Sequence, residues 1–305
     1  MNGIQKVIKY CAMAFAVFLS VSIFGSIAVA VISLVSASAL KDGFYGENRI
    51  TLSERYSATE IEELGIERIF VECNAEIIVR QGDELSIEAQ NVPEDYRLRC
   101  NNGTLHLYST RKNFFLFLFG IGSRSEREKV TVTVPEWYTP KEVKIDSGSG
   151  SVSITELHAE RLDMDTGSGK VNVANVFAKE TIIDSGSGRI TAENSELGRL
   201  QLDSGSGAVG FQNVKAENVN VDSGSGKIQW EGELTGNCNF ETGSGSVSLQ
   251  LAGSESEYRI KVSSGSGGVR VNGRKTDDGS YGTNVRGELR IDSGSGAVNV
   301  KFDED

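Results

Sequence analysis

The sequence is poor in the residues that build local metal sites. It has two histidines and four cysteines in 305 residues, and the cysteines, Cys11, Cys73, Cys100 and Cys238, form no C-x-x-C pair. A structural zinc site or a haem-attachment motif needs such pairs, or more histidines nearby. We therefore expect no metal and no cofactor.

Basic clusters are also lacking. The formal net charge is −11, and no Lys/Arg cluster occurs beyond the first ten residues. Nucleic acids are bound through a basic stripe that neutralises phosphates. The charge pattern indicates a solvated acidic surface and argues against a nucleic-acid partner.

Enzyme motifs are missing as well. Gly-x-Gly follows several predicted strands, but the helix and the third glycine of a dinucleotide site do not come after it. There is no Gly-x-Ser-x-Gly elbow of a serine hydrolase. We predict no catalytic residue and expect that the protein is not an enzyme.

One long segment carries no charge. The residues from Tyr10 to Leu40 include no Asp, Glu, Lys or Arg, and this length exceeds the ~20 residues that an α-helix needs to cross a bilayer. Residues 10–40 are therefore predicted to form one transmembrane helix. Two lysines precede it, so the positive-inside rule places residues 1–9 in the cytoplasm and the remainder of the chain outside the cell membrane.

The segment around the end of the span leaves one alternative open. Ala37–Ala39 resembles a signal-peptidase site, although the length of the apolar run favours an uncleaved anchor. Residues 41–65 are predicted to be a linker. Within it, Ser57 and Glu60 have the spacing of a capping box, which predicts a short helix.

Glycine is abundant, and its positions are periodic. Sixteen of the 35 glycines lie in eight copies of a corner motif, Asp-Ser-Gly-Ser-Gly or a close variant. The first six copies follow one another at a constant interval, whereas the last two follow at longer intervals. A fixed period of this length is typical of a solenoid. The copies begin at Asp146, Asp165, Asp184, Asp203, Asp222, Glu241, Ser263 and Asp292.

Apolar residues form columns at the same period and alternate at period two on both sides of each corner. Each repeat therefore predicts two strands that stack on those of the next repeat. The predicted fold class is all-β: a right-handed parallel β-solenoid over residues 66–305, with its 19-residue repeats starting at residue 146, preceded by the transmembrane helix. One such column contains Val152, Val171, Ile190, Val209, Ile228 and Val247.

The corner residues have predicted roles. Glycine is expected to supply backbone angles that other residues avoid. The second serine of each corner is expected to point inward and to form a ladder of hydroxyl groups. This ladder would contain Ser149, Ser168, Ser187, Ser206, Ser225 and Ser244.

A second column is predicted to mark the opposite corner of each coil. It contains Asn175, Asn194, Asn213 and then Gly232, and both residue types tolerate the left-handed conformation. The stacked aspartates of the motif leave two alternatives open, a column of solvated corner caps or a cation-binding column, although Ca²⁺ needs more oxygen ligands than one column supplies. Whether Cys73 and Cys100 form a disulfide also stays open.

One apolar segment does not fit a soluble surface. It consists of Phe114, Phe115, Leu116, Phe117, Leu118 and Phe119, with Arg111-Lys112 before it and Arg124 after it. It is predicted either to be a buried strand or cap over the open end of the core, or to contact the membrane or a partner.

Several motifs in order give the chain a family resemblance. Ile77-Ile78-Val79, the strand from Val130 to Val134 closed by Pro135, the recurrent Ser-Gly corners and a final Leu289-Arg290-Ile291-Asp292 follow one another. In this the chain resembles the bacterial putative-adhesin family of unknown function, which includes parts of envelope-stress-associated membrane proteins and is related to auto-transporter adhesin heads.

The resemblance implies a non-enzymatic function in the cell envelope. We expect a membrane-anchored, extracytoplasmic binding or scaffold protein that is adhesin-like or linked to envelope sensing. Its expected partners are the membrane, envelope proteins and surface glycans. The alternative is a carbohydrate-active enzyme on a β-solenoid, because a sequence does not show which carboxylates lie close in space.

Overall fold

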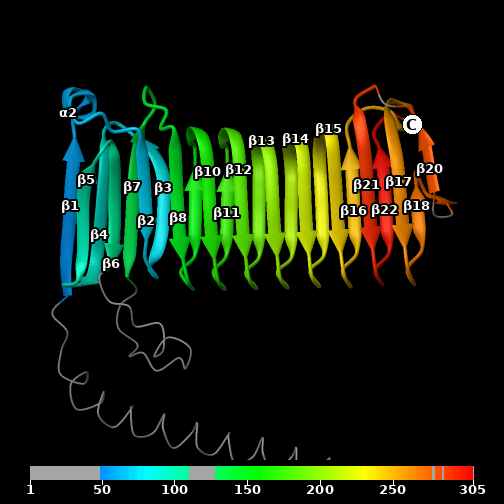
Figure 1. Ribbon diagram of the computed structural model, residues 1–305, viewed down its shortest axis with the longest axis horizontal. Helices are drawn as coiled ribbons and strands as arrows, with labels where there is room; N and C mark the ends of the chain where they lie inside the picture. Colours follow the sequence, from blue (N-terminus) through cyan, green and yellow to red (C-terminus); the bar gives the residue numbers. More distant parts are fainter. Residues whose placement is uncertain (1–48, 110–127, 277–278, 284, 305) are drawn as a thin grey trace, which may run out of the picture. The chain divides into compact units, whose positions relative to one another are not determined.

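The computed structural model describes residues 49–109, 128–276, 279–283 and 285–304. The predicted cytoplasmic segment and transmembrane helix, residues 1–9 and 10–40, lie outside these ranges. Among the described residues, no helix has the length and apolar character needed to cross a membrane. The described part is almost entirely β-structure (Figure 1).

The described residues form one α-helix, one 3-10 helix and a long series of strands. The helices are α2 (Ala58–Glu63) and η1 (Glu255–Glu257). The strands are β1 (Arg49–Tyr56), β2 (Arg68–Glu72), β3 (Glu76–Gly82), β4 (Leu85–Pro93), β5 (Tyr96–Asn101), β6 (Thr104–Ser109), β7 (Lys129–Pro135), β8 (Glu142–Ser147), β9 (Val152–Thr155), β10 (His158–Thr166), β11 (Val171–Ala174), β12 (Phe177–Ser185), β13 (Ile190–Ser204), β14 (Val209–Ser223), β15 (Ile228–Thr242), β16 (Val247–Leu251), β17 (Tyr258–Ser264), β18 (Val269–Val271), β19 (Arg274–Thr276), β20 (Gly279–Gly282), β21 (Gly287–Ser293) and β22 (Val298–Phe302).

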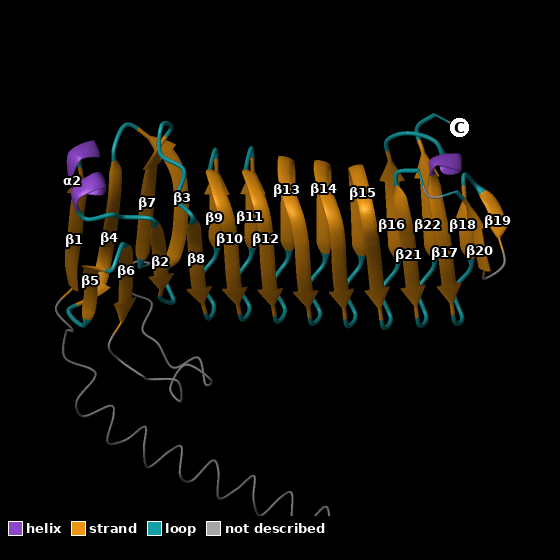
Figure 2. Cartoon of the chain, turned by 45° about the horizontal axis from the view of Figure 1, so that its top comes forward, coloured by secondary structure: helices purple, strands orange, loops and turns teal. Residues whose placement is uncertain are grey.

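The strands stack into a rod whose coils lie directly above one another. Asp184 on β12 is aligned with Asp165 on β10 and with Asp203 on β13, and both pairings are parallel. Residues one repeat apart therefore occupy equivalent places on successive coils, which confirms the stacking predicted from the repeat. Figures 1 and 2 show this series of coils in two views.

The rod has two faces and two edges. Face 1 is formed by β6, β2, β8, β10, β12, the second halves of β13 to β15, β21 and β17. Face 2 is formed by β7, β3, β9, β11, the first halves of β13 to β15, β16, β22 and β18. The Ser-Gly corners join face 1 to face 2 along one edge. The narrow edge lies opposite and includes residues 156–160, 175–179, 194–198 and 213–217.

The core lies between the two faces. The predicted apolar columns point into it, and Val152, Ile190 and Ile228 are completely buried. Near the middle of the rod the ring of Trp230 lies 4.9 Å from that of Phe211 and 6.0 Å from that of Phe240, measured between ring centroids. Each side chain buried in this way stabilises the fold by about 1.5–3 kcal/mol.

Left-handed residues turn the chain at the narrow edge. The φ angles of Asn175, Asn194 and Asn213 are 54°, 49° and 52°, and that of Gly232 is 145°. The Nδ2 atom of Asn213 donates a hydrogen bond of 2.8 Å to Oδ1 of Asn194 on the preceding coil. The predicted column is confirmed for the three asparagines, whereas a register shift aligns Gly232 with Val214 and places it outside the column.

The glycines of the Ser-Gly corners have a different role from the predicted one. None of them has a φ in the left-handed region. Instead, a Cβ atom at Gly188 would overlap the backbone carbonyl of Gly169 on the coil below, and one at Gly207 would overlap that of Gly188. Glycine is required because successive corners pack backbone against backbone.

The predicted serine ladder is wrong by two residues. Ser149 and Ser168 are exposed, whereas Ser147 and Thr166, the second residues of their corners, are buried. The alternation of the strand continues past Ile145, so the residue two positions later still points inward. There the Oγ atom of Ser147 donates to the carbonyl oxygen of Gly150 at 3.2 Å.

The order of coils along the rod departs from the order in the sequence at both ends. Strand β21 lies between β15 and β17, and β22 lies between β16 and β18, so the last coil is inserted between two earlier ones. Near the other end, β2 lies between β6 and β8, and β3 lies between β7 and β9. The longer intervals before the last two corners hold η1 and the strands β19 and β20.

Antiparallel strands complete both ends of the rod, so the prediction of an all-parallel solenoid is wrong there. At one end β4 pairs with β1 and β7, and β5 pairs with β6. At the other end β20 pairs with β17, and β19 pairs with β18. Short hairpins join β5 to β6 and β18 to β19, and parallel partners cannot be joined by so short a connection.

The sheet also begins earlier than residue 66. Strand β1 lies within the predicted linker and pairs with β4. The capping box of α2 is present, because the Ser57 side chain accepts from the backbone N–H of Glu60, and the Glu60 carboxylate accepts from that of Ser57. Cys73 and Cys100 are free thiols, so the structure contains no disulfide between them.

Candidate interaction surfaces

Face 1 carries a row of carboxylates beside the Ser-Gly corners. Parallel pairing aligns the first corner residue of each coil, and at one end the row extends to β2. Neighbouring strands lie about 4.8 Å apart, so successive members are close. We call this the acidic row, and it contains Glu72, Asp146, Asp165, Asp184, Asp203, Asp222, Glu241 and Asp292.

The acidic row changes the titration of two of its members. Burial raises the pKa of Asp184, and the neighbouring carboxylates of Asp165 and Asp203 raise it further. The pKa of Asp146 is raised by burial and then by Asp165 and Glu72. Among the described residues, no group of three or more His, Cys, Asp or Glu side chains is placed to hold a metal ion.

Face 2 carries an uncharged row of its own. It contains the outward residue that follows the first buried residue of each strand from β7 to β22, and none of these nine residues is charged. Exposed cations, among them Lys170, Arg189 and Lys227, lie between this row and the Ser-Gly corners. The two faces of the rod therefore present different chemistry to a partner. The uncharged row consists of Thr131, Ile78, Ser153, Asn172, Thr191, Gly210, Gln229, Ser248 and Asn299.

The narrow edge collects exposed apolar side chains. Among the described residues, four large hydrophobic side chains are exposed, and three of them lie along this edge near α2: Leu64 (47%), Trp137 (58%) and Phe177 (44%). His158 belongs to the same group, because its ring stacks on that of Phe177 with the centroids 5.8 Å apart. We call these four residues the edge strip.

At the end of the rod near β1, the described chain begins at Arg49 and resumes at Glu128. The Arg49 guanidinium lies 2.6 Å from Oε1 of Glu128, and the Tyr96 hydroxyl donates to Oε2 of Glu128 at 3.0 Å. Residues 110–127, including Phe114–Phe119, lie outside the described residues. The predicted contact segment is therefore connected to the rod directly beside Arg49.

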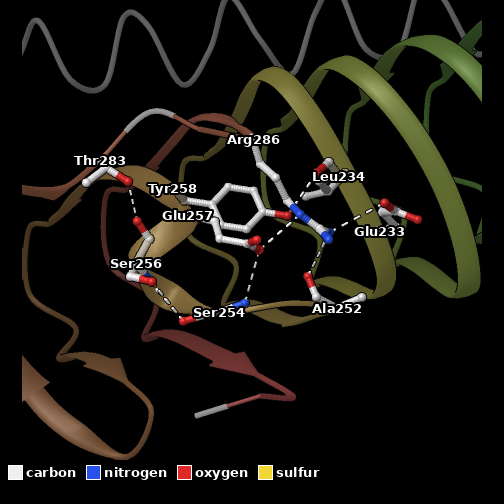
Figure 3. A network of polar contacts seen from close by, with 9 residues as sticks. All are labelled: Glu233, Leu234, Ala252, Ser254, Ser256, Glu257, Tyr258, Thr283 and Arg286. Carbon is white, nitrogen blue, oxygen red and sulfur yellow. Dashed lines mark hydrogen bonds and ion pairs between the residues drawn. The ribbon is translucent and has the colours of Figure 1, made fainter.

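A polar network surrounds Arg286 where the last coil enters the stack (Figure 3). Its Nε atom lies 3.0 Å from Oε2 of Glu257, and its Nη1 atom lies 3.4 Å from Oε1 of Glu233 and donates to the carbonyl oxygen of Ala252 at 3.3 Å. The buried Tyr258 hydroxyl donates to a backbone carbonyl on β15 at 2.9 Å. Burial raises the pKa of Tyr258, and its hydrogen bond with Arg286 partly offsets this effect.

The network links the inserted coil to both of its neighbours. Arg286 directly precedes β21, Glu233 lies on β15, and Glu257 directly precedes β17. Ion pairs of this partly exposed kind stabilise a fold modestly, but several bonds to one guanidinium add geometric specificity. The arrangement is structural: it fixes the coil between β15 and β17.

The fold and the corner motif agree with a known family. A family model described as Toastrack DUF4097 matches residues 66–301. The chain belongs to this family. This match confirms the resemblance drawn from the order of the strand and corner motifs.

Several solved structures resemble this Toastrack chain. A putative cell adhesion protein from Clostridium sporogenes is 14% identical, with 84% of this chain and 100% of that chain covered and a TM-score of 0.31. A putative adhesin from Bacteroides fragilis is 13% identical, with coverage of 84% and 98% and a TM-score of 0.40. A putative lipid binding protein from Parabacteroides distasonis is 20% identical, with coverage of 83% and 96% and a TM-score of 0.45. No curated protein matches the sequence.

Three features of this Toastrack chain are not visible in its sequence pattern. Trp137 lies in the loop between β7 and β8, outside the periodic repeats, so no column indicated its place on the narrow edge. Phe177 belongs to a column that also contains His158 and Glu196, and a column of mixed character gives no apolar signal. The ion pairs of Arg286 join segments that are far apart in the sequence, which no local pattern shows.

Proposed function

We propose that this chain is a membrane-anchored extracytoplasmic binding or scaffold protein, and not an enzyme. The observation that carries the proposal is the continuous stack on face 1. It runs from β5 through β6, β2, β8 and the later coils to β20, and eleven strand spacings of ~4.8 Å give a rod of about 50 Å. A rigid rod with chemically distinct faces suits display and docking.

The membrane anchor is part of the proposal. Residues 10–40 form one transmembrane helix, residues 1–9 lie in the cytoplasm, and a right-handed solenoid lies outside. Arg49, where the described chain begins, lies at the β1 end of the rod. The proposed partners of the rod are envelope proteins and surface glycans.

The segment Phe114–Phe119 is assigned a contact with the membrane or with a partner in it. The support is positional, since Glu128 follows this segment and is paired with Arg49, which follows the proposed anchor. Apolar residues flanked by basic ones are suited to the interface of a membrane.

Fractionation and capture test the proposal. The full-length chain should remain with membranes after a high-salt and alkaline wash, and protease added outside should digest residues beyond 41. The intact chain, used as bait on solubilised membranes, should retain a partner that a Phe115→Ser, Phe117→Ser variant retains less well. Extraction by the wash, or release of reducing sugar from a polysaccharide by the purified chain, would contradict the proposal.

A further inference from the structure

The edge strip is continuous across neighbouring layers of the rod. The Tyr138 hydroxyl donates to the carbonyl oxygen of Ile66 at 2.8 Å, which places the loop of Trp137 against the residues that follow α2. The next layers are joined by backbone hydrogen bonds from Glu160 to Pro140 at 3.0 Å and from Phe177 to Leu157 at 2.8 Å. Figures 1 and 2 show α2 and the turns before β8, β10 and β12 along this edge, opposite the Ser-Gly corners.

The side chains along the strip remain exposed even though His158 and Phe177 stack on each other. The residues next to them, Ile66, Pro140, Ala159 and Ala178, are buried and complete the core beneath. A contiguous exposed group of large apolar side chains on a soluble surface marks an interaction site more often than isolated ones do. Aromatic residues such as Trp137 are enriched among the residues that dominate binding energy.

The charges beside the strip are unbalanced. Residues 62–67, 136–141, 156–160 and 175–179 contain six glutamates and two lysines. The two lysines are already paired, Lys141 with Glu67 and Lys179 with Glu160. The other four glutamates form no ion pair among the described residues, and each lies within two residues of a member of the strip: Glu62, Glu63, Glu136 and Glu156.

From this geometry we infer that the edge strip docks a peptide segment of a protein partner that carries apolar side chains together with lysines or arginines. The apolar side chains cover Leu64, Trp137 and Phe177, and the cations face the four unpaired glutamates, which gives complementary charge. An anionic lipid surface would meet like charges at the same place. The inference extends the proposed binding role, rests on it, and assigns it a surface and a class of partner.

The two tryptophans of the chain make the strip directly observable. Trp137 is exposed, whereas Trp230 is buried in the core with 2% of its surface accessible. Acrylamide therefore quenches mainly Trp137. The experiment uses the full-length chain in phosphatidylcholine vesicles and a synthetic amphipathic helix with leucines on one face and lysines on the other. Binding should shift the emission of Trp137 to shorter wavelength, protect it from acrylamide and reach saturation.

Variants on and off the strip decide the assignment. Leu64→Ser and Phe177→Ser should each weaken binding of the lysine peptide by roughly tenfold. Val285→Ser is the matched control, because Val285 is the fourth exposed large hydrophobic side chain among the described residues and does not belong to the strip. This variant should bind as the unaltered chain does. Equal effects of Phe177→Ser and Val285→Ser would overturn the assignment.

Charge variants test the other half of the inference without removing an apolar contact. A Glu63→Gln, Glu136→Gln variant should bind the lysine peptide more weakly, and the loss should shrink at high salt. A peptide with glutamate in place of every lysine should not bind. Equal binding of the two peptides, or a response to phosphatidylglycerol vesicles in place of the lysine peptide, would show that the strip is not a site for basic peptides.

Failure of the edge-strip inference can be distinguished from failure of the proposed function. If the lysine peptide does not bind, but the membrane capture experiment retains the same partner with Leu64→Ser and Phe177→Ser as with the intact chain, the strip assignment fails and the binding role stands. If the intact chain retains no partner at all, the binding role itself fails.

Discussion

Replacing Asp184 by asparagine should stabilise the rod at neutral pH. Asp184 lies in the acidic row between Asp165 and Asp203, one strand spacing from each. Two unit charges ~4.8 Å apart in water repel by about 0.9 kcal/mol. Salt at physiological concentration, with a Debye length of about 8 Å, reduces this by nearly half. Removing both repulsions should therefore raise the free energy of unfolding by about 1 kcal/mol.

The pH dependence gives the sign of the effect. The folded-state pKa of Asp184 is raised, by burial and then by its two neighbours. Above this pKa the carboxylate is charged, and the destabilisation is present in full. As the pH falls through this pKa toward the ordinary value of an aspartate, the folded protein binds the proton first and the destabilisation disappears. The advantage of Asp184→Asn should therefore be largest at pH 7 and absent at low pH.

Thermal unfolding of the full-length chain measures this effect. A gain of about 1 kcal/mol in a domain of this size should raise the unfolding midpoint by about 2–4 °C at pH 7. Glu193→Gln is the control, because Glu193 lies on face 2 between Ala174 and Gln212, which are both uncharged. A lower midpoint for Asp184→Asn at pH 7, or an equal gain for Glu193→Gln, would refute the reasoning.

Three further predictions concern the backbone and the inserted coil. Gly188→Val should lower the free energy of unfolding by about 3 kcal/mol or prevent folding, because its side chain would overlap the coil below. Gly210→Val on face 2 has open space and should be tolerated. Thermal unfolding of the two variants measures the difference. Arg286→Met should speed hydrogen exchange in β21 and lower the free energy of unfolding by about 1–3 kcal/mol. Arg290 forms an exposed ion pair within its own strand, so Arg290→Gln should change the free energy of unfolding by less than about 1 kcal/mol. Asn194→Val should lower the unfolding midpoint by the equivalent of about 1–2 kcal/mol, and replacement by glycine should not, because the position has a φ of 49°.

The middle of the rod could be predicted from the sequence because one period governs it. A constant repeat with apolar columns leaves a single way to stack the coils, and the aligned positions of Asp165, Asp184 and Asp203 follow directly. The left-handed asparagines were predictable for the same reason. The serine ladder was predicted two residues too late. Ser149 has the same parity as Ile145 and Ser147, but β8 ends at Ser147, so the inward alternation does not extend to Ser149, which is exposed.

The ends of the rod were not predictable in this way. Every corner offers the same backbone surface to its neighbours, so the sequence does not specify which coil follows which in space. The longer intervals before the last two corners indicate inserted segments, but they do not indicate that β21 lies between β15 and β17. The edge strip could not be predicted either, because Leu64 and Trp137 belong to connections that lie outside the repeats.

The insertion of the last coil has a consequence for how the molecule is made and how it resists force. The layer between β15 and β17 stays vacant until residues 287–302 have been synthesised, so this half of the molecule closes only late in translation. Tension applied to the chain beyond Phe302 reaches strands that are bonded along both sides. They have to slide out by shear, with many bonds breaking together, and cannot be unzipped one bond at a time. A rod built in this way resists force most strongly when the chain is pulled at its last coil.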